Sequence, residues 1–145
     1  MSEPGYQQPD LNLVGAEHIR RYQETDGEVG YIWNGVTALL LTTTGKRSGQ
    51  PRTSALIFGR DGDDYLIVAS QGGAPTHPNW YHNLQARPEA EIQVKSEHIP
   101  VMARTAGPDE KPRLWKIMTD EWPNYDVYQT RTDREIPLVV LTPRK

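Results

Sequence analysis

The chain has 145 residues, with 16 Lys and Arg against 19 Asp and Glu, a formal net charge of −3, and no cysteine. The acidic balance argues against nucleic acid as a partner, and the lack of cysteine excludes disulfides, thiol nucleophiles and thiolate metal sites. No apolar run approaches the roughly 20 residues of a membrane-spanning helix, and the polar start is unlike a signal peptide. We therefore expect one cytoplasmic domain over residues 1–145.

The first predicted elements are an arm and a short helix. Residues 1–12 carry two prolines and little to bury, which predicts a loose N-terminal arm. Apolar residues then recur at helical spacing as far as residues 25–27, where a glycine ends the pattern. The members of this predicted helical face are Leu13, Val14, Ile19 and Tyr22.

Three strands with short turns follow. We predict strands over about 37–43 and 52–60, joined by a loop with a glycine at each end. Asp61-Gly62-Asp63 is a strong hairpin signal, and the strand after it, 65–70, is apolar on both faces. Strands that follow one another through short turns form an antiparallel meander and not βαβ units.

The second half alternates helices and strands. A helix from about residue 79 ends before Pro88, strands follow over 89–95 and 98–105, and Asp109 is the expected N-cap of the next helix. Pro123 ends that helix, a short helix carries Tyr125 and Tyr128, and the last strand covers 136–141. These elements predict a mainly β, α+β fold, a six-stranded antiparallel split β-barrel with helices over its mouth. Some apolar surface would then be covered by a second copy in a homodimer.

The loop between the first two strands is the candidate anion site. Lys46, Arg47 and Ser48 lie between Gly45 and Gly49, and Arg52 comes just after them. Glycines let backbone amides turn toward a ligand, and amides together with cations bind phosphate or carboxylate. The loop lacks the Walker A pattern, because a strand follows it where a helix should. The alternative interpretation is an ordinary solvated turn.

Three hydroxyls are candidates for the reacting end of a site. Ser70 ends a buried strand, where its hydroxyl would face a bound ring or substrate oxygen or, alternatively, bond the backbone. Tyr125 and Tyr128 stand among polar residues, which is typical of a lid, although aromatic residues at helical spacing more often form core. The four histidines have no metal-ligand spacing, so we expect no metal site.

Four segments in order resemble the deazaflavin (F420)-dependent nitroreductase and F420H2-dependent quinone reductase family of actinobacteria. They are Thr42–Arg52, Ala69–Ala74, Pro78–Leu84 and Thr132–Pro137. The resemblance implies the FMN-binding, pyridoxamine-phosphate-oxidase-like split barrel and coenzyme F420 as the cofactor. It also implies hydride transfer from the reduced deazaflavin to a quinone-like or nitro-aromatic acceptor, with Ser70, Tyr125 or Tyr128 donating a hydrogen bond to that acceptor.

The resemblance also implies the cofactor contacts, by position. The phosphate and glutamyl tail would contact Lys46, Arg47, Ser48 and Arg52. The ring would contact Thr53, Ser54, Ala55, Leu56, Ile57, Val68, Ala69, Ser70, Gln71 and Tyr125, and the segment Asn79, Trp80, Tyr81, His82 and Asn83 would close over it.

Three positions differ from the family's best-known member, which activates nitroimidazole prodrugs. Ile57 and Trp122 stand where that member has tyrosine, and Gln71 where it has lysine. Two other functions keep the same barrel. One is an FMN-dependent oxidoreductase, and the other is a non-catalytic carrier of F420 or of a fatty acid.

Overall fold

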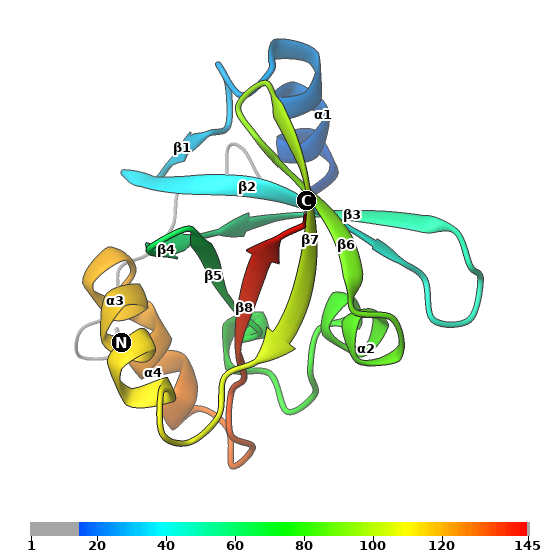
Figure 1. Ribbon diagram of the computed structural model, residues 1–145. Coiled ribbons are helices and arrows are strands. Elements are labelled where there is room, and N and C mark those ends of the chain that lie inside the picture. Colours follow the sequence, from blue (N-terminus) through cyan, green and yellow to red (C-terminus); the bar gives the residue numbers. More distant parts are fainter. Residues whose placement is uncertain (1–14, 145) are drawn as a thin grey trace.

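The computed structural model describes residues 15–144, which form one curled antiparallel sheet with four α-helices around it (Figure 1). The helices are α1 (Gly15–Thr25), α2 (Asn79–Ala86), α3 (Lys111–Glu121) and α4 (Asn124–Thr130), with one 3-10 turn, η1 (Gln71–Gly73). The strands are β1 (Ile32–Trp33), β2 (Val36–Thr44), β3 (Pro51–Ile57), β4 (Gly59–Asp61), β5 (Asp64–Val68), β6 (Glu89–Val94), β7 (Glu97–Thr105) and β8 (Leu138–Pro143).

The strands close on themselves as a barrel. Their order is β1-β2-β6-β7-β8-β5-β4, and β3 pairs with the other edge of β2. Because β3 and β4 are separated by Phe58 alone, they are two halves of one bent strand that joins β2 to β5. The split-barrel prediction is therefore confirmed, and so is the meander from β2 to β5. The six predicted strands correspond to six long ones, to which the structure adds the short strand β1 and the bend within the second.

The bend at Phe58 has a packing cause. A Cβ on Gly59 would lie 2.7 Å from the sulfur of Met118, so α3 packs directly against the backbone at this point. Phe58 keeps the hairpin hydrogen bond to Thr37, at 3.2 Å, and then β4 turns to pair with β5. The bend opens β3 away from β5, and the apolar cavity described below lies beside it.

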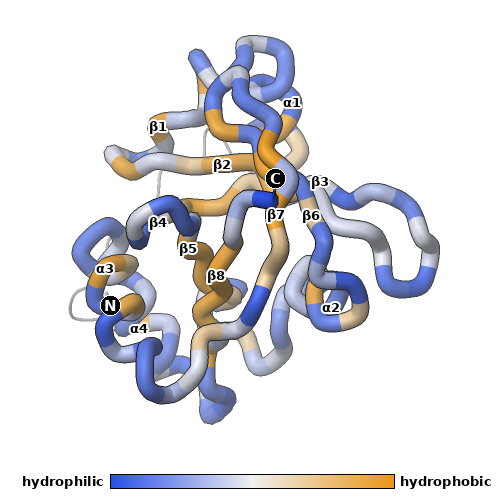
Figure 2. Tube along the Cα trace, viewed as in Figure 1, coloured by the Kyte–Doolittle hydropathy of each residue, from blue (hydrophilic) through white to orange (hydrophobic). Residues whose placement is uncertain are grey.

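Two apolar clusters fill the molecule. One lies inside the barrel, between β2, β5, β6 and β8, and includes the fully buried Leu39, Ile67 and Ile92. The other joins the opposite faces of β5 and β8 to α3 and α4 through residues such as Leu66 and Met118. Figure 2 shows the hydrophobic stretches along β2, β5 and β8 and hydrophilic residues on the turns. Burial on both sides explains why these strands read as continuous apolar runs.

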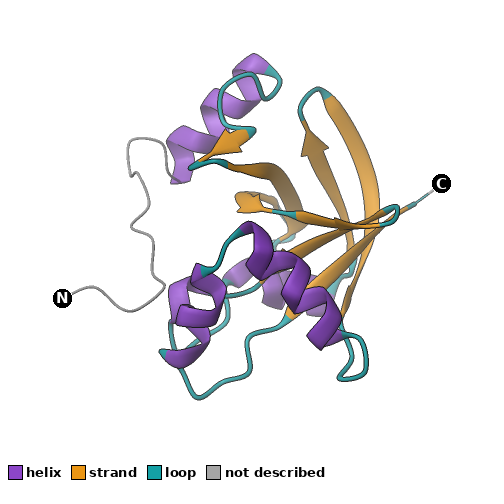
Figure 3. Cartoon of the chain, turned by 90° about the vertical axis from the view of Figure 1, so that its left-hand side faces the viewer, coloured by secondary structure: helices purple, strands orange, loops and turns teal. Residues whose placement is uncertain are grey.

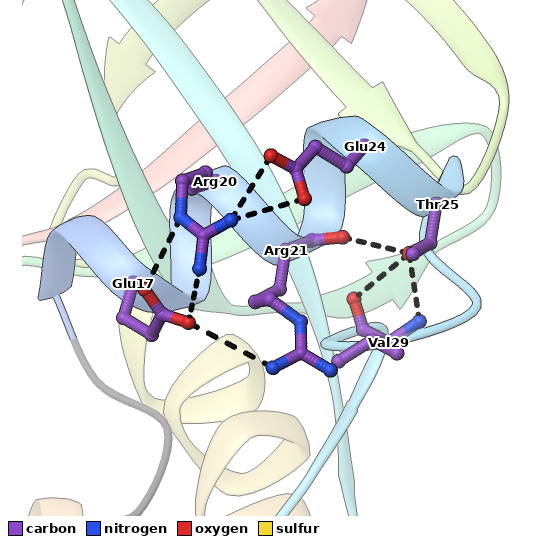
Figure 4. Close-up of polar contacts among 6 residues, drawn as sticks. All are labelled: Glu17, Arg20, Arg21, Glu24, Thr25 and Val29. Atoms are coloured by element: carbon purple, nitrogen blue, oxygen red, sulfur yellow. Dashed lines mark hydrogen bonds and ion pairs between the residues drawn. The ribbon is translucent and has the colours of Figure 1, made fainter.

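The helices lie around one side of the curled sheet, as the view in Figure 3 shows. Within α1, His18 and Tyr22 are buried, and the Tyr22 hydroxyl bonds Ala38, Gln93 and the backbone N–H of Lys95. The other face of α1 is polar. Arg20 pairs with Glu17 and Glu24, and Arg21 with Glu17 (Figure 4).

Two local predictions need comment. Asp109 is not the N-cap of α3, because the helix begins at Lys111 and Glu110 precedes it. The Glu110 carboxylate accepts a hydrogen bond from the Gly107 N–H at 3.1 Å and pairs with Arg104, whose hydrogen bonds lower the pKa of that carboxyl. The predicted arm, together with Leu13 and Val14, lies outside the described residues; Ile19 is half-buried.

Candidate active site

Two cavities adjoin at the open end of the barrel. A largely apolar one of about 370 Å³ and a larger polar one of about 750 Å³ share Ser54 and Trp80 in their walls. The apolar cavity is lined by Gly15, His18, Trp33, Ala38, Ser54, Ala55, Leu56, Ile57, Val68, Ser70, Gln71, Gly72, Pro78, Trp80, Trp122, Tyr125 and Tyr128. The polar one is lined by Gly45, Lys46, Arg47, Ser48, Arg52, Ser54, Asn79, Trp80, His82 and Asn83. A ligand with a flat body and a charged extension would span both.

The polar cavity is cationic. Lys46, Arg47 and Arg52 are exposed on the β2–β3 hairpin, and no carboxylate in residues 15–144 forms an ion pair with any of them. The loop is closed by hydrogen bonds from the Gly45 N–H to the Gln50 carbonyl (2.8 Å) and from the Gly49 N–H to the Gly45 carbonyl (2.9 Å). Three positive charges gathered without a counter-charge favour an anionic ligand.

Asn83 connects this hairpin to α2. Its Oδ1 accepts a hydrogen bond from the Lys46 N–H at 2.9 Å, and its amide nitrogen donates to Thr43 Oγ1 at 3.1 Å. The Asn83 side chain is buried. The pair of bonds therefore fixes the start of the cationic loop against the helix that forms the opposite wall of the polar cavity.

The apolar cavity is bounded on one side by β3, from Ser54 to Ile57, and by Val68 at the end of β5. The chain then turns through η1, where Gln71 and Gly72 adopt positive φ angles of 45° and 64°. These turns bring Ser70 and Gln71 to the cavity wall. Ser70 is buried, at 8% exposure, and the structure describes no hydrogen bond from its hydroxyl to residues 15–144.

Arg134 holds this turn in place without a carboxylate. Its guanidinium donates to the carbonyls of Ser70 (2.7 Å), Ala74 (2.9 Å) and Ala69 (3.2 Å), and lies 2.9 Å from Nδ1 of His77. Burial, and next the positive charge of Arg134, lower the pKa of His77. The neutral imidazole can then accept a hydrogen bond from the guanidinium.

The segment from Trp122 to Tyr128 covers the cavity from the other side. Tyr125 and Tyr128 have ring centroids 6.1 Å apart, and the indole of Trp122 donates to the Tyr128 hydroxyl at 3.4 Å. Burial, and then the neighbouring Tyr128, raise the pKa of Tyr125, so its hydroxyl keeps its proton. A Cβ on Gly73 would lie 2.6 Å from the Tyr128 carbonyl, so the lid and η1 are in backbone contact.

A further wall comes from residues to which the sequence analysis gave no role. His18 on α1 stacks on Trp33 of β1, with ring centroids 6.1 Å apart and planes 16° apart, and Trp33 lies 5.8 Å from Trp122. Gly15, Ala38, Gly45, Gly72 and Pro78 also line the two cavities without having been proposed. No motif signals His18 or Trp33, since both reach the cavity only through the docking of α1 and β1.

Seventeen of the twenty predicted site residues line one cavity or the other, and three do not. Thr53 turns its hydroxyl to Thr42 at 2.9 Å, and Ala69 is fully buried in the core. Tyr81 lies on the far face of α2, where its hydroxyl is 2.8 Å from that of Thr105. Alternation along a strand and around a helix explains why neighbours in sequence face different sides.

Comparison with known proteins identifies the family of the chain. The model of the family described as F420H(2)-dependent quinone reductase matches residues 15–143. An F420H(2)-dependent quinone reductase of Mycobacterium tuberculosis is 47% identical over 131 residues, which is 88% of each chain.

Solved structures agree as well. That of an F420-H2 dependent reductase is 38% identical, with a TM-score of 0.67 over 72% of this chain and 92% of that one. Another, described as a domain-swapped dimer, is 34% identical, with a TM-score of 0.70 over 85% and 96%. The resemblance in the four sequence segments is thus confirmed across most of the fold, and the chain belongs to the F420H(2)-dependent quinone reductase family.

Proposed function

We propose that this protein binds reduced coenzyme F420 across the two cavities and transfers its hydride to a quinone. The observation that carries the proposal is the junction of a cationic cavity with an apolar one at Ser54 and Trp80. That arrangement suits a coenzyme with a flat ring at one end and a phosphate with a glutamyl tail at the other. Family membership supports the same assignment.

The donor set fits the charged end of the coenzyme. Lys46, Arg47 and Arg52 would hold its phosphate and carboxylates, since guanidinium and ammonium groups bind both. Ser48 lies in the same loop, and Asn79, His82 and Asn83 form the opposite wall. The ring end would lie along Ser54–Ile57 with Val68, Ser70 and Gln71 beside it. Thr53, Ala69 and Tyr81 would support these walls from behind.

The coenzyme, when bound, supplies two electrons as a hydride from a ring carbon. The protein holds that ring and the acceptor face to face and keeps water away, for which the apolar walls and the lid are suited. Negative charge grows on the acceptor oxygen, and a hydroxyl that stays protonated stabilises it. We assign that role to Tyr125, Tyr128 or Ser70, all three of which line the apolar cavity.

The acceptor is the finer part of the proposal. Ile57, Gln71 and Trp122, which differ from the nitroimidazole-activating relative, all line the apolar cavity. Their apolar and neutral character favours a quinone over a nitro-aromatic acceptor. Among residues 15–144, no helix has the length and hydropathy to cross a membrane. A homodimer stays a prediction, to be tested by sedimentation.

One experiment tests the function. The purified protein is titrated with F420 and, in parallel, with FMN, and is then mixed with reduced F420 and menadione. We expect saturable binding of F420, weaker or no binding of FMN, and recovery of the deazaflavin absorbance when menadione is added. Tight FMN binding without F420 binding would establish the flavin alternative. F420 binding without turnover would establish a carrier.

A further inference from the structure

His18 is a buried titratable side chain in the wall of the apolar cavity, and the mechanism above gives it no role. It is 5% exposed and comes from α1, which packs against β3. A buried histidine costs free energy unless its nitrogens are matched to partners. The partners of its two nitrogens therefore indicate what it does.

One nitrogen of His18 has a fixed partner. Nε2 lies 2.8 Å from the carbonyl oxygen of Gly30, and because a carbonyl only accepts, Nε2 carries a hydrogen. Gly30 has a φ of +107°, and a Cβ there would lie 2.9 Å from Cδ2 of the imidazole. The backbone at Gly30 thus approaches the ring as only a glycine permits, and it fixes both the orientation and the tautomer of His18.

The other nitrogen remains accessible. No hydrogen bond to Nδ1 is described within residues 15–144, and no buried side-chain nitrogen or oxygen in that range lacks a partner. Nδ1 is therefore not sealed in the core. Since the imidazole lines the apolar cavity, that cavity is the space onto which we take Nδ1 to open.

The neighbours of His18 place it beside an aromatic surface. Its ring is stacked on Trp33, and Trp33 lies against Trp122, so the three rings form a continuous stretch of the cavity wall. A flat aromatic acceptor bound against these rings would have Nδ1 of His18 near its edge, where quinone oxygens project.

We infer that His18 is the proton donor to the quinone oxygen, an inference that rests on the proposed function. As the hydride adds, its electron pair reduces the quinone and leaves negative charge on an oxygen. The Nδ1–H bond of the imidazolium breaks and an O–H bond forms, which completes the hydroquinone. The imidazole is left neutral with its Nε2–H still on the Gly30 carbonyl, and it takes the next proton from solvent.

Few ionisable groups surround His18. Tyr22 on the same helix has its ring 6.4 Å away, Trp33 comes from β1, and Tyr125 and Tyr128 line the same cavity from α4. No Lys, Arg, Asp or Glu of residues 15–144 forms a described ion pair with His18. A pH dependence that disappears with His18 is thus attributable to its own imidazole.

His18→Gln separates proton donation from a structural role. The glutamine amide nitrogen takes the place of Nε2 and can donate to Gly30, but the variant has no titratable group in the position of Nδ1. We expect folding and F420 affinity close to wild type, and single-turnover reduction of menadione about 10²-fold slower. The wild-type rate should depend on pH in a way that the variant rate does not.

A matched control and a spectroscopic readout complete the test. His98→Gln, on an exposed strand position with its side chain 54% accessible, should leave rate and pH profile unchanged. In wild-type protein with ¹⁵N-labelled imidazoles, His18 should show a protonated Nε2, and its Nδ1 resonance should shift when menadione is added. An unshifted Nδ1, or equal rates for wild type and His18→Gln, would overturn the inference while leaving the proposed function intact. Failure of wild type to oxidise reduced F420 would instead remove the proposed function.

Discussion

Basic side chains lie both on the outer face of α1 and on the β2–β3 hairpin, but their surroundings differ. On α1 both arginines are paired, Arg20 with Glu17 and Glu24 and Arg21 with Glu17 (Figure 4). On the hairpin, Lys46, Arg47 and Arg52 gather around one cavity with no carboxylate partner in residues 15–144. Paired charges on an exposed helix face support the helix only weakly. Unpaired charges that repel one another give no such support, so the hairpin points to a ligand.

The largest expected effect comes from removing the hairpin charges. A Lys46→Ala, Arg47→Ala double variant should weaken F420 binding by about 10²-fold to 10⁴-fold, because each lost charge-assisted contact contributes roughly 1.5–3 kcal/mol. Binding is measured by fluorescence titration, with the tail-less ring fragment alongside. The control is Arg20→Ala, Arg21→Ala on α1, which should bind F420 as wild type does. Equal losses for F420 and for the ring fragment would contradict the role of the hairpin.

The reacting end of the site should respond in rate and not in affinity. Tyr125→Phe removes a hydroxyl whose pKa is raised by burial and which would stabilise charge on the acceptor. We expect turnover to fall by about 10²-fold, with F420 affinity changed by less than about twofold. Steady-state kinetics with menadione and a parallel binding titration check this. Unchanged turnover would remove Tyr125 from the catalytic set.

Asn83 tests whether the unpaired charges are held in position by the fold. Asn83→Ala removes the acceptor for the Lys46 N–H and the donor to Thr43, both in a buried environment. We expect F420 affinity to fall about tenfold and the free energy of unfolding to fall by roughly 1–3 kcal/mol. Asn79→Ala, on the exposed start of α2, is the matched control for stability. A stable Asn83→Ala variant with wild-type affinity would show that the β2–β3 loop keeps its conformation without Asn83.

Arg134 differs from the cations of α1 and of the hairpin, because carbonyl oxygens and the neutral His77 surround it. The contact with His77 can be tested by changing the pH. The pKa of His77 is lowered in the folded protein, by burial first and then by Arg134. A lowered histidine pKa contributes stability above the unfolded-state value, and this contribution is lost as the pH falls through that value toward the folded one. The denaturant midpoint should therefore fall more between about pH 7.5 and about pH 5.5 in wild type than in His77→Gln. Equal slopes for the two proteins would argue against this coupling, and His98→Gln should keep the wild-type slope.

The smallest effect is expected on α1 itself. Arg20→Ala should lower the free energy of unfolding only slightly, and by less in high salt, because its partners are half-exposed and screened. Urea denaturation at two salt concentrations measures the difference. A loss of stability as large as that expected for Asn83→Ala would show that the surface pairs of α1 do more than support the helix.

The part of the site that the sequence predicts is the part that is local in the chain. The hairpin around Lys46 is visible because glycines and cations lie within a few residues of each other. Ser70 stands out at the end of a buried strand, and Tyr125 through the polar residues around it. Alternating and continuous apolar runs likewise predict the barrel. These signals need no knowledge of tertiary contacts.

The rest depends on contacts between distant segments. The bend at Phe58 arises because α3 packs on Gly59, 59 residues before Met118 in the sequence. The glycine itself can be read from the sequence, but its contact with α3 cannot. His18 and Trp33 join the site only because α1 and β1 dock beside the α3–α4 connection. Thr53 and Tyr81 are predicted as cofactor contacts because they belong to segments that line the site. Only the register of β2 with β3 and the orientation of α2 show that their side chains point elsewhere.

The narrow junction at Ser54 and Trp80 has a consequence for how the protein can diversify. Because the two cavities share so few side chains, the residues that retain the coenzyme and those that select the oxidant form nearly separate sets. Lengthening the glutamate chain of the coenzyme should tighten retention without altering the speed of the chemistry. Substitutions around the aromatic wall, in turn, would change which oxidants the enzyme reduces while the coenzyme stays bound.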